Sequence, residues 1–439
     1  MSALLATGAR LATMCVSLVC GVLAARLVIG EAGVEWFALL SLLVALPGLI
    51  SFSDLGAGAV VVGAIATSSD VRRDEQLIEL VTSVVRIMLC FAGAVLVTNL
   101  VLGLTGGWTL ILGSTGDLPG ATAGAVVCLL VWVATVSLGI WQRILLGLRR
   151  NHLVILLQGL ISPISLLGIW IMLSLGGRGA RPFLALGTFI ATLVVAVLGL
   201  VVAHRSTAPL LRETAGRVFH PRRFRSVRVM DVGWAMFAQI LAAPLSLTVP
   251  RYILAQTASS NELARYALAG QVFFALQALI GAAGLTLWPA FARARAEGEL
   301  RRGPAIPSLL FGAGAVGATT ITVLIGPWFF GLLSNGQLTV PTELILSFGA
   351  MVTLQAVLYP LGMFIMDGPG IRFQVLPSLL SAGSTVGLTV LFAPLLGAPG
   401  PLLAFAISVV IAQIVPYALY IRRHRDRLYG RPRESIEAL

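Results

Sequence analysis

The sequence contains no lysine and few acidic residues. Its 30 basic residues are all arginines, they face 18 acidic residues, and the formal net charge is +12. Charged residues make up 11% of the chain, whereas a soluble domain carries roughly 25%. Hydrophobic residues make up 58%. This composition excludes a soluble enzyme and indicates that most of the protein faces lipid, and the exclusive use of arginine is typical of a GC-rich bacterial genome.

Cysteine is also scarce, and none of it has the spacing of a metal or redox site. Cys15, Cys20, Cys90 and Cys128 all lie inside apolar runs, without CxxC or Cys/His patterns. We therefore predict no disulfide, no metal and no cofactor. The arginines lie in short loops with few aromatic residues among them, which indicates membrane topology and not nucleic-acid binding.

Apolar runs long enough to cross the hydrocarbon core recur along the whole chain. The predicted spans are 9–29, 35–67, 77–103, 121–147, 153–175, 183–204, 229–250, 262–291, 305–333, 341–366, 372–393 and 399–421. Alternate loops on one side carry most of the arginines, and the other side has only Arg178, Arg181, Arg251 and Arg265. Because arginine-rich loops stay in the cytoplasm, we expect an all-α integral membrane protein of about twelve transmembrane helices with both termini cytoplasmic.

The longest and most basic connection lies near the middle of the chain, at 205–228 (RSTAPLLRETAGRVFHPRRFRSVR). It predicts an N-terminal six-helix lobe over 1–204, this cytoplasmic linker, a C-terminal six-helix lobe over 229–421 and a basic tail over 422–439. A faint similarity between ARLVIGEAGVEWFALLSLL and PRYILAQTASSNELARYALAGQV supports a parallel repeat of the two lobes.

Two segments resemble a known family of exporters. LARYALAGQVFFALQALIGAAGLTLWPAFARARAEGE resembles the eighth helix of the polysaccharide-transporter, or O-antigen flippase, branch of the multidrug/oligosaccharidyl-lipid/polysaccharide (MOP) superfamily. ARLVIGEAGVEWFALL followed by SFSDLGAGAVVVGAIA resembles the opening hairpin of that branch. Glu35 and Trp36 replace its usual glycine-tyrosine pair, so the chain looks like a divergent member.

The resemblance implies a fold, a substrate and partners. The fold is a V-shaped pair of six-helix bundles around a central cavity, in the bacterial cytoplasmic membrane. The activity is the outward flipping of undecaprenyl-diphosphate-linked oligosaccharide by alternating access, for surface polysaccharide biosynthesis. Expected partners are this lipid-linked oligosaccharide, membrane lipids and a coupling ion, H⁺ or Na⁺.

Three arginines are candidate ligands for the diphosphate, because the planar guanidinium fork binds phosphate bidentately and stays charged. Arg86 lies well inside the third span, where a charge needs a partner or water. Asp54, inside the second span, either forms a structural pair with Arg86 or tunes an Arg86 that faces the cavity. Arg26 and Arg251 hold equivalent places near the outer ends of the first helix of each lobe. Each either extends to the interface or binds phosphate.

Aromatic and amide groups recur at helical spacing along the eighth span, at Tyr266, Gly270, Phe274 and Gln277. Tyr266 and Gln277 are the candidate sugar contacts on this face. The alternative for both is ordinary packing between helices.

Two other functions compete with the flippase. A cation-coupled exporter of the multidrug and toxin extrusion type would use intramembrane carboxylates, and Asp54 is the only deep carboxylate in the sequence. A membrane polysaccharide polymerase would carry a sizeable outer loop, whereas the longest one predicted here is 104–120. The arginines favour an anionic lipid substrate.

Overall fold

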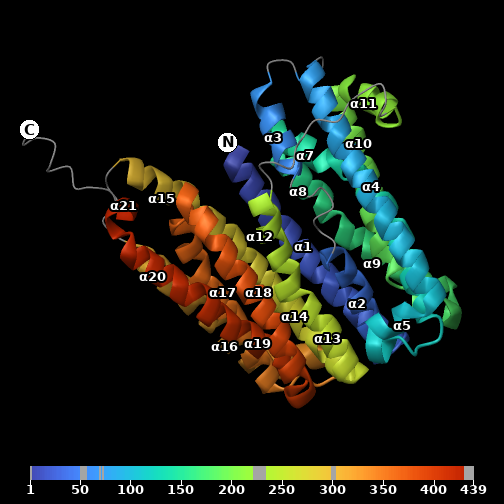
Figure 1. The fold of residues 1–439 in the computed structure, drawn as a ribbon. Coiled ribbons are helices and arrows are strands. Elements are labelled where there is room, and N and C mark those ends of the chain that lie inside the picture. Colours follow the sequence, from blue (N-terminus) through green and yellow to red (C-terminus); the bar gives the residue numbers. More distant parts are fainter. Residues whose placement is uncertain are drawn as a thin grey trace, which may run out of the picture. The chain divides into compact units, whose positions relative to one another are not determined.

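The computed structural model is built almost entirely from helices and describes residues 2–49, 57–68, 71, 74–220, 234–297 and 303–429. No β-strand occurs in these residues. The chain divides into two compact units, Met1–Leu241 and Ala242–Leu439 (Figure 1). The part of the predicted linker that is described, 205–220, belongs to the first unit.

Ten helical segments of the described chain are long and apolar enough to cross a membrane. They are Gly8–Glu31, Glu75–Thr105, Ala121–Gly147, Asn151–Leu175, Leu186–Thr207, Ser260–Arg295, Ala305–Leu333, Thr342–Phe364, Gly368–Leu396 and Pro399–Arg423. The two other predicted spans, 35–67 and 229–250, include residues outside the described part of the chain. The prediction of an all-α, multi-pass membrane protein is confirmed.

The first unit is a bundle of long apolar helices and shorter helices, and it ends with the short helix α11. Its helices are α1 (Ser2–Glu31), α2 (Val34–Leu49), α3 (Ala57–Thr67), α4 (Glu75–Thr105), α5 (Gly107–Leu112), α6 (Ala121–Leu138), α7 (Ile140–Gly147), α8 (Asn151–Gly159), α9 (Ile161–Leu175), α10 (Leu186–Thr207) and α11 (Leu210–Val218). Helix α1 packs on α8 and α9, α4 packs on α6, and α10 packs on α6 and α9.

Helix α4 begins at a well-formed N-cap. The Asp74 carboxylate accepts hydrogen bonds from the backbone N–H groups of Gln76 (3.1 Å) and Leu77 (3.2 Å) and from the Ser68 hydroxyl (2.8 Å). The Ser68 hydroxyl, followed by the Leu77 N–H, lowers the pKa of Asp74. These bonds satisfy N–H groups that a helix start leaves without intrahelical partners, and they fix the end of α4 on which α11 packs.

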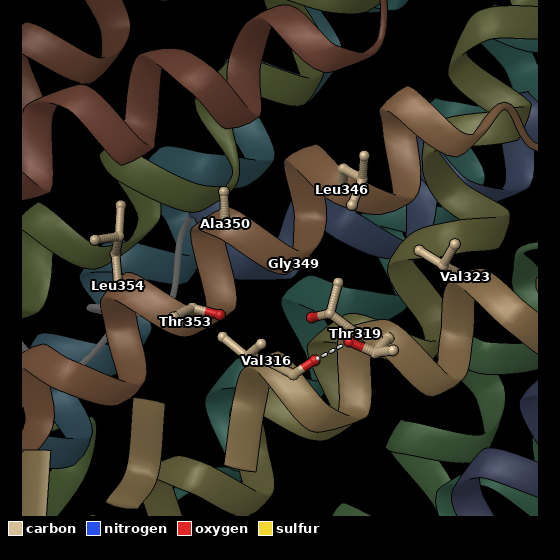
Figure 2. Close-up of a pocket in the computed structure, with 9 residues that line it drawn as sticks. Val316, Thr319, Val323, Leu346, Gly349, Ala350, Thr353 and Leu354 are labelled. Atoms are coloured by element: carbon tan, nitrogen blue, oxygen red, sulfur yellow. Dashed lines mark hydrogen bonds between the residues drawn. The ribbon is translucent and has the colours of Figure 1, made fainter. Parts of the chain in front are cut away.

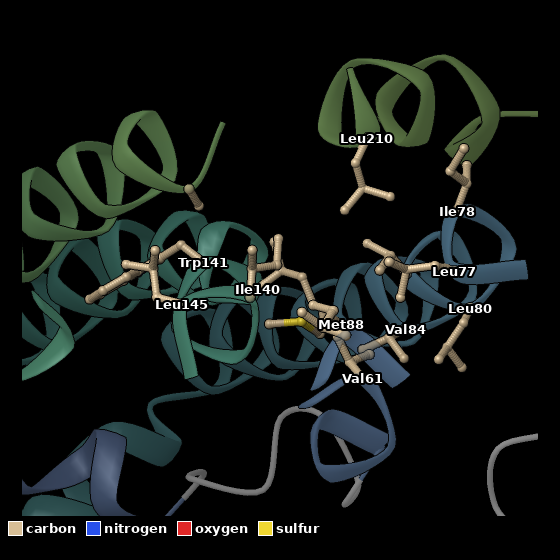
Figure 3. Packing of buried hydrophobic residues seen from close by; sticks show 14 of the residues in the cluster. Val61, Leu77, Ile78, Leu80, Val84, Met88, Ile140, Trp141, Leu145 and Leu210 are labelled. Atoms are coloured by element: carbon tan, nitrogen blue, oxygen red, sulfur yellow. The ribbon is translucent and has the colours of Figure 1, made fainter. Parts of the chain in front are cut away.

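Helix α11 occupies the first half of the predicted linker and packs on α4 and α10. Leu210, Thr214 and Val218 follow one another at a spacing of one helical turn and are all buried. Figure 3 shows Leu210 facing Leu77 and Ile78 of α4 within the apolar core of this unit. This part of the linker is therefore an amphipathic helix whose buried face packs on α4 and α10.

The second unit has a similar helical make-up. After α12 (Trp234–Leu247), which contains the boundary between the units, come α13 (Val249–Thr257), α14 (Ser260–Leu285), α15 (Leu287–Ala296), α16 (Ala305–Leu333), α17 (Thr342–Phe364), α18 (Gly368–Leu396), α19 (Pro399–Val409), α20 (Val415–Arg423) and α21 (Arg425–Tyr429). Helix α17 packs on α14, α16 and α19, and α18 packs on α13 and α19. A single π-helical turn, Val410–Ile414, joins α19 to α20.

The start of α14 is tied to a distant turn of the same unit. The Glu262 carboxylate accepts hydrogen bonds from Nη1 of Arg265 (2.7 Å) and from the backbone N–H of Ala398 (3.2 Å), just before α19. Gly397 has a φ of +63°, and a Cβ there would lie 3.1 Å from the same carboxylate. The contact holds α14 in a fixed position relative to the turn between α18 and α19.

Candidate functional site

An arginine sits against a group of aromatic rings in the second unit. Helix α13 supplies Arg251, α14 supplies Tyr266, Phe273 and Phe274, and α17 supplies Phe348; we call these residues the Arg251 cluster. The guanidinium carbon of Arg251 lies 5.5 Å from the ring centroid of Tyr266 and 5.5 Å from that of Phe274. Both distances lie within the range of about 6 Å for a cation–π interaction.

Phe348 is the centre of the ring packing. Its centroid lies 5.0 Å from Tyr266, 5.3 Å from Phe273 in a stacked arrangement and 5.8 Å from Phe274 edge to face. Tyr266, Phe273 and Phe348 are buried, whereas Arg251 and Phe274 are partly exposed. The inner rings therefore form a fixed support, and the cation lies at its accessible edge.

The backbone explains how Arg251 reaches these rings. The seventh predicted span breaks at Thr248, and Pro250 lies in the first turn of α13, where its missing N–H costs no intrahelical bond. Arg251 follows directly. On α14, a Cβ at Gly270 would lie 2.8 Å from the Phe274 ring, so this glycine leaves the space that the ring occupies one turn later.

Amide groups lie beside the aromatic face of α14. Gln277 is partly buried and follows Phe274 by three residues, which places the two on adjacent turns of one face. The Oε1 atom of Gln271 is buried and has no hydrogen-bond partner in the part of the chain that the structure describes. Stacking rings, amides and a guanidinium together offer contacts for a phosphorylated sugar.

Arg26 is the predicted counterpart of Arg251 in the first unit, but its setting differs. Arg26 lies in the last two turns of the long helix α1, whereas Arg251 lies in the first turn of the short helix α13. Arg26 is exposed, whereas Arg251 is partly buried against its rings. The two arginines belong to different units. The prediction that both bind phosphate stays a prediction.

Arg86 binds the end of α11. Its Nε donates to the carbonyl oxygen of Val218 (2.9 Å), and its Nη2 donates to that of Arg217 (2.7 Å). These carbonyls belong to the last turn of α11, where a helix leaves acceptors unsatisfied and where its dipole favours a cation. Asp54 lies outside the described residues, so the predicted Asp54–Arg86 pair is not tested.

Arg217 also attaches α11 to α4. Its guanidinium forms a bidentate ion pair with the Glu75 carboxylate at the start of α4, in which the Nη2–Oε2 distance is 3.1 Å. Sequence reasoning missed the contacts of both arginines with distant parts of the chain. The signal that could have found them is the helical spacing of Leu210, Leu211 and Val218 inside the linker, which predicts a helix with a buried face.

A cavity of about 550 Å³ lies between α16 and α17 (Figure 2). Its lining is mostly apolar, with Val316, Val323 and Leu346 among the residues, and it also includes the threonines Thr319, Thr320 and Thr353. Gly349 lets the two helices approach closely, because a Cβ there would overlap the Thr319 side chain. The preceding residue, Phe348, is buried in the Arg251 cluster, so the cavity opens on another face of α17. Its chemistry suits a hydrocarbon chain.

Carboxylates are confined to the helix ends in the described spans. Those in α1, α2, α4, α14 and α17 lie in the first two turns or at the last residue: Glu31, Glu35, Glu75, Glu79, Glu262 and Glu343. The described residues also contain no group of three or more His, Cys, Asp or Glu side chains that could hold a metal ion.

Solved membrane transporters share this fold. A structure described as the lipid II flippase MurJ in an inward closed conformation superposes with a TM-score of 0.71 at 13% identity, over 95% of this chain and 87% of that one. An inward-facing multidrug resistance MATE family transporter of the MOP superfamily gives 0.64 at 19% identity, over 92% and 94%. At these identities the likeness shows the fold. No curated protein matches the chain in sequence.

The family is shown by sequence. The profile of a family described as polysaccharide biosynthesis protein matches residues 2–295, which include the whole first unit together with Arg251 and Tyr266 of the second. The match covers well over half of the 439 residues. With its apolar helices and this match, the chain is a multi-pass membrane protein of the polysaccharide biosynthesis protein family.

Proposed function

We propose that the protein flips undecaprenyl-diphosphate-linked oligosaccharide from the cytoplasmic to the outer leaflet of the bacterial inner membrane by alternating access. The observation that carries this proposal is the Arg251 cluster. It holds a permanent cation 5.5 Å from two aromatic rings on membrane helices of a polysaccharide biosynthesis family member. Both termini are cytoplasmic in this proposal, in keeping with the distribution of arginines in the loops.

Each part of the substrate has a chemical counterpart in the chain. Arg251 is the ligand for the diphosphate, and Arg26 is the corresponding candidate in the first unit. The partly exposed Phe274 offers a ring face to the sugars, Gln277 and Gln271 offer amides, and the buried Tyr266 supports the guanidinium of Arg251. The apolar cavity between α16 and α17 has room for part of the polyprenyl chain. The lipid II flippase that shares the fold is a flippase by its own description, which supports the same class of substrate.

A cation-coupled drug exporter is the second candidate, and the MATE structures that share the fold favour it. Such an exporter needs a carboxylate deep in the membrane to attract cations. The carboxylates of the described spans lie at helix ends, and Arg251 would repel a cationic drug. Coupling of lipid transport to H⁺ or Na⁺ is part of the flippase proposal.

The test is transport in reconstituted vesicles. Labelled undecaprenyl-diphosphate oligosaccharide is placed in one leaflet, a membrane-impermeant probe detects it in the other, and proton or sodium gradients are imposed. We expect translocation well above that of protein-free vesicles, a severe loss in Arg251→Gln, and normal transport in Arg178→Gln, which alters an exposed arginine outside the cluster. Translocation no faster than in empty vesicles, together with uptake of a cationic dye, would establish the drug exporter instead.

A further inference from the structure

A second cavity lies in the first unit, beneath α11. It has a volume of about 520 Å³ and is lined by α4, α6, α7, α10 and α11. We infer that this cavity binds one anionic phospholipid, with the phosphate at Arg205 and Arg212 and an acyl chain along its apolar walls. The inference concerns bound lipid and does not depend on which substrate the protein transports.

The lining has the chemistry of an amphiphile site. Val85, Ile140 and Leu200 contribute apolar walls from three different elements. His204, Arg205 and Arg212 also line the cavity, on α10 and α11, and all three are exposed. The lining of the cavity includes no acidic residue. Guanidinium groups beside the apolar walls of this cavity suit a phosphate ester attached to a hydrocarbon chain.

An unsatisfied hydroxyl is a second and independent observation. Thr214 lines the cavity, is only 3% exposed, and its Oγ1 is buried without a hydrogen-bond partner in the described structure. Neighbouring hydroxyls differ, because Ser137 donates to the Val133 carbonyl (3.2 Å) and Thr207 to that of Ala203 (2.8 Å). A buried polar group without a partner is costly. A phosphate or glycerol oxygen in the cavity would supply the missing acceptor.

An apolar stripe on α10 points to a lipid as the occupant, as opposed to free phosphate. Val194, Val197, Leu198 and Val201 are all exposed, and Val201 also lines the cavity. Their spacing places them along one side of the helix. An acyl chain can therefore follow the membrane-facing side of α10 up to the cavity. Free phosphate would leave these apolar walls without a counterpart.

The position of the site gives the bound lipid a mechanical role. The cavity is closed on one side by Leu211, Thr214 and Val218 of α11, and Arg86 holds the carbonyl of Val218. An anionic lipid that contacts Arg205 of α10 and Arg212 of α11 would stabilise the packing of α11 at a second point. Loss of the lipid would loosen α11 without altering the membrane spans.

The experiment measures lipids retained by the full-length protein in native mass spectrometry. Phosphatidylglycerol, phosphatidylethanolamine, inorganic phosphate and undecaprenyl diphosphate are each added to protein purified in a neutral detergent. We expect wild type to retain one phosphatidylglycerol in preference to phosphatidylethanolamine, and inorganic phosphate not to displace it. Arg205→Gln with Arg212→Gln should weaken retention by at least about tenfold, because each arginine near an anionic headgroup contributes roughly fivefold.

Matched variants separate the site from general charge. Arg422→Gln with Arg423→Gln removes the same charge from exposed residues of α20 and should leave retention unchanged. Ala215→Phe places a large side chain in the cavity and should reduce retention of phosphatidylglycerol. Ala134→Phe, at an exposed alanine outside the cavity, should not. The inference would be overturned if both double arginine variants retained the lipid equally, or if Ala215→Phe left retention unaffected. It would also be overturned if inorganic phosphate displaced the lipid, or if the protein showed an arginine-dependent preference for undecaprenyl diphosphate.

Discussion

The Nη2 atom of Arg86 donates a 2.7 Å hydrogen bond to the carbonyl oxygen of Arg217, and the two residues are 131 positions apart in the sequence. Arg295 makes a related contact in the second unit, where it donates to the carbonyls of Leu428 (2.9 Å) and Phe364 (2.8 Å). Arg86 thus holds two carbonyls in the last turn of α11, whereas Arg295 links one carbonyl of the short helix α21 to the carbonyl at the end of α17. These two arginines therefore have a structural role in tertiary packing.

Replacing Arg86 should release α11. Arg86→Gln removes two hydrogen bonds from a charged donor, each worth about 1.5–3 kcal/mol, so we expect a lower unfolding temperature and faster proteolysis near Phe219, which is already 79% exposed. Thermal unfolding in detergent and limited proteolysis measure the two effects. Arg10→Gln, at an exposed arginine of α1, is the control. Unchanged proteolysis in Arg86→Gln would contradict the anchoring role.

A double variant separates the two partners considered for Arg86. If Asp54 and Arg86 formed a buried pair, removing one partner would cost about 3–5 kcal/mol and removing both would restore much of it. The carbonyls of α11 lose their donor whatever residue stands at position 54. We therefore expect Arg86→Ala with Asp54→Ala to fold no better than Arg86→Ala alone. Recovered expression and unfolding temperature in the double variant would show that the pair dominates.

Substitutions of Arg251 should lower the export activity to different degrees. Arg251→Lys keeps the charge but loses the planar fork and should retain partial export, whereas Arg251→Glu should retain almost none. Tyr266→Leu should reduce export by removing a ring face from the cation, an interaction worth about 0.5–2 kcal/mol. Initial transport rates in vesicles give the comparison, with Arg178→Lys and Arg178→Glu as controls. Equal rates for Arg251→Lys and Arg251→Glu would refute a phosphate ligand at this position.

A single methyl group should test the packing of the first unit. Gly199 of α10 lies so close to the buried Trp141 ring that a Cβ would overlap it. Gly199→Ala should therefore destabilise the protein by about 1–3 kcal/mol through overpacking. Gly93→Ala is the control, because a Cβ there meets no atom within 4 Å. Similar unfolding temperatures for the two variants would contradict the contact.

Reporter fusions test the orientation. Fusions after residues 150, 215, 298 and 430 should report the cytoplasm, and fusions near 33, 112, 179, 258, 336 and 397 should report the exterior, because arginine-rich loops are retained inside. Paired cytoplasmic and periplasmic reporters at each site provide the measurement. A reversed signal at two or more sites would refute the assigned topology.

Hydropathy predicted the membrane helices well where their ends carry clear signals. The spans 121–147 and 305–333 coincide with Ala121–Gly147 and Ala305–Leu333, which begin directly after Gly120 and Pro304. Internal breaks were not predicted, since Thr248 and Thr286 interrupt apolar runs without any change in composition. Hydropathy responds to burial in lipid and not to local changes of helix axis.

The candidate site was predicted only in part. Helical spacing placed Tyr266, Phe274 and Gln277 on one face of α14, because that relation is local. Phe348 could not be assigned to the same cluster, since it comes from α17 and no periodicity links the two helices. The partners of Arg86 were missed because backbone carbonyls have no signature in the sequence, and only the tertiary packing of α11 brings them near.

The π-helical turn at Val410–Ile414 has a consequence for length variation in the last span. Such a turn accommodates one residue more than an α-helical turn while the segments on either side keep their faces. Deleting one residue within 410–414 would convert the turn to regular α-helix and leave Tyr417 and Ile421 in the core that they share with Phe364. A deletion elsewhere in α19 would rotate every later side chain by about 100°, so natural relatives should tolerate a one-residue deletion at this turn first.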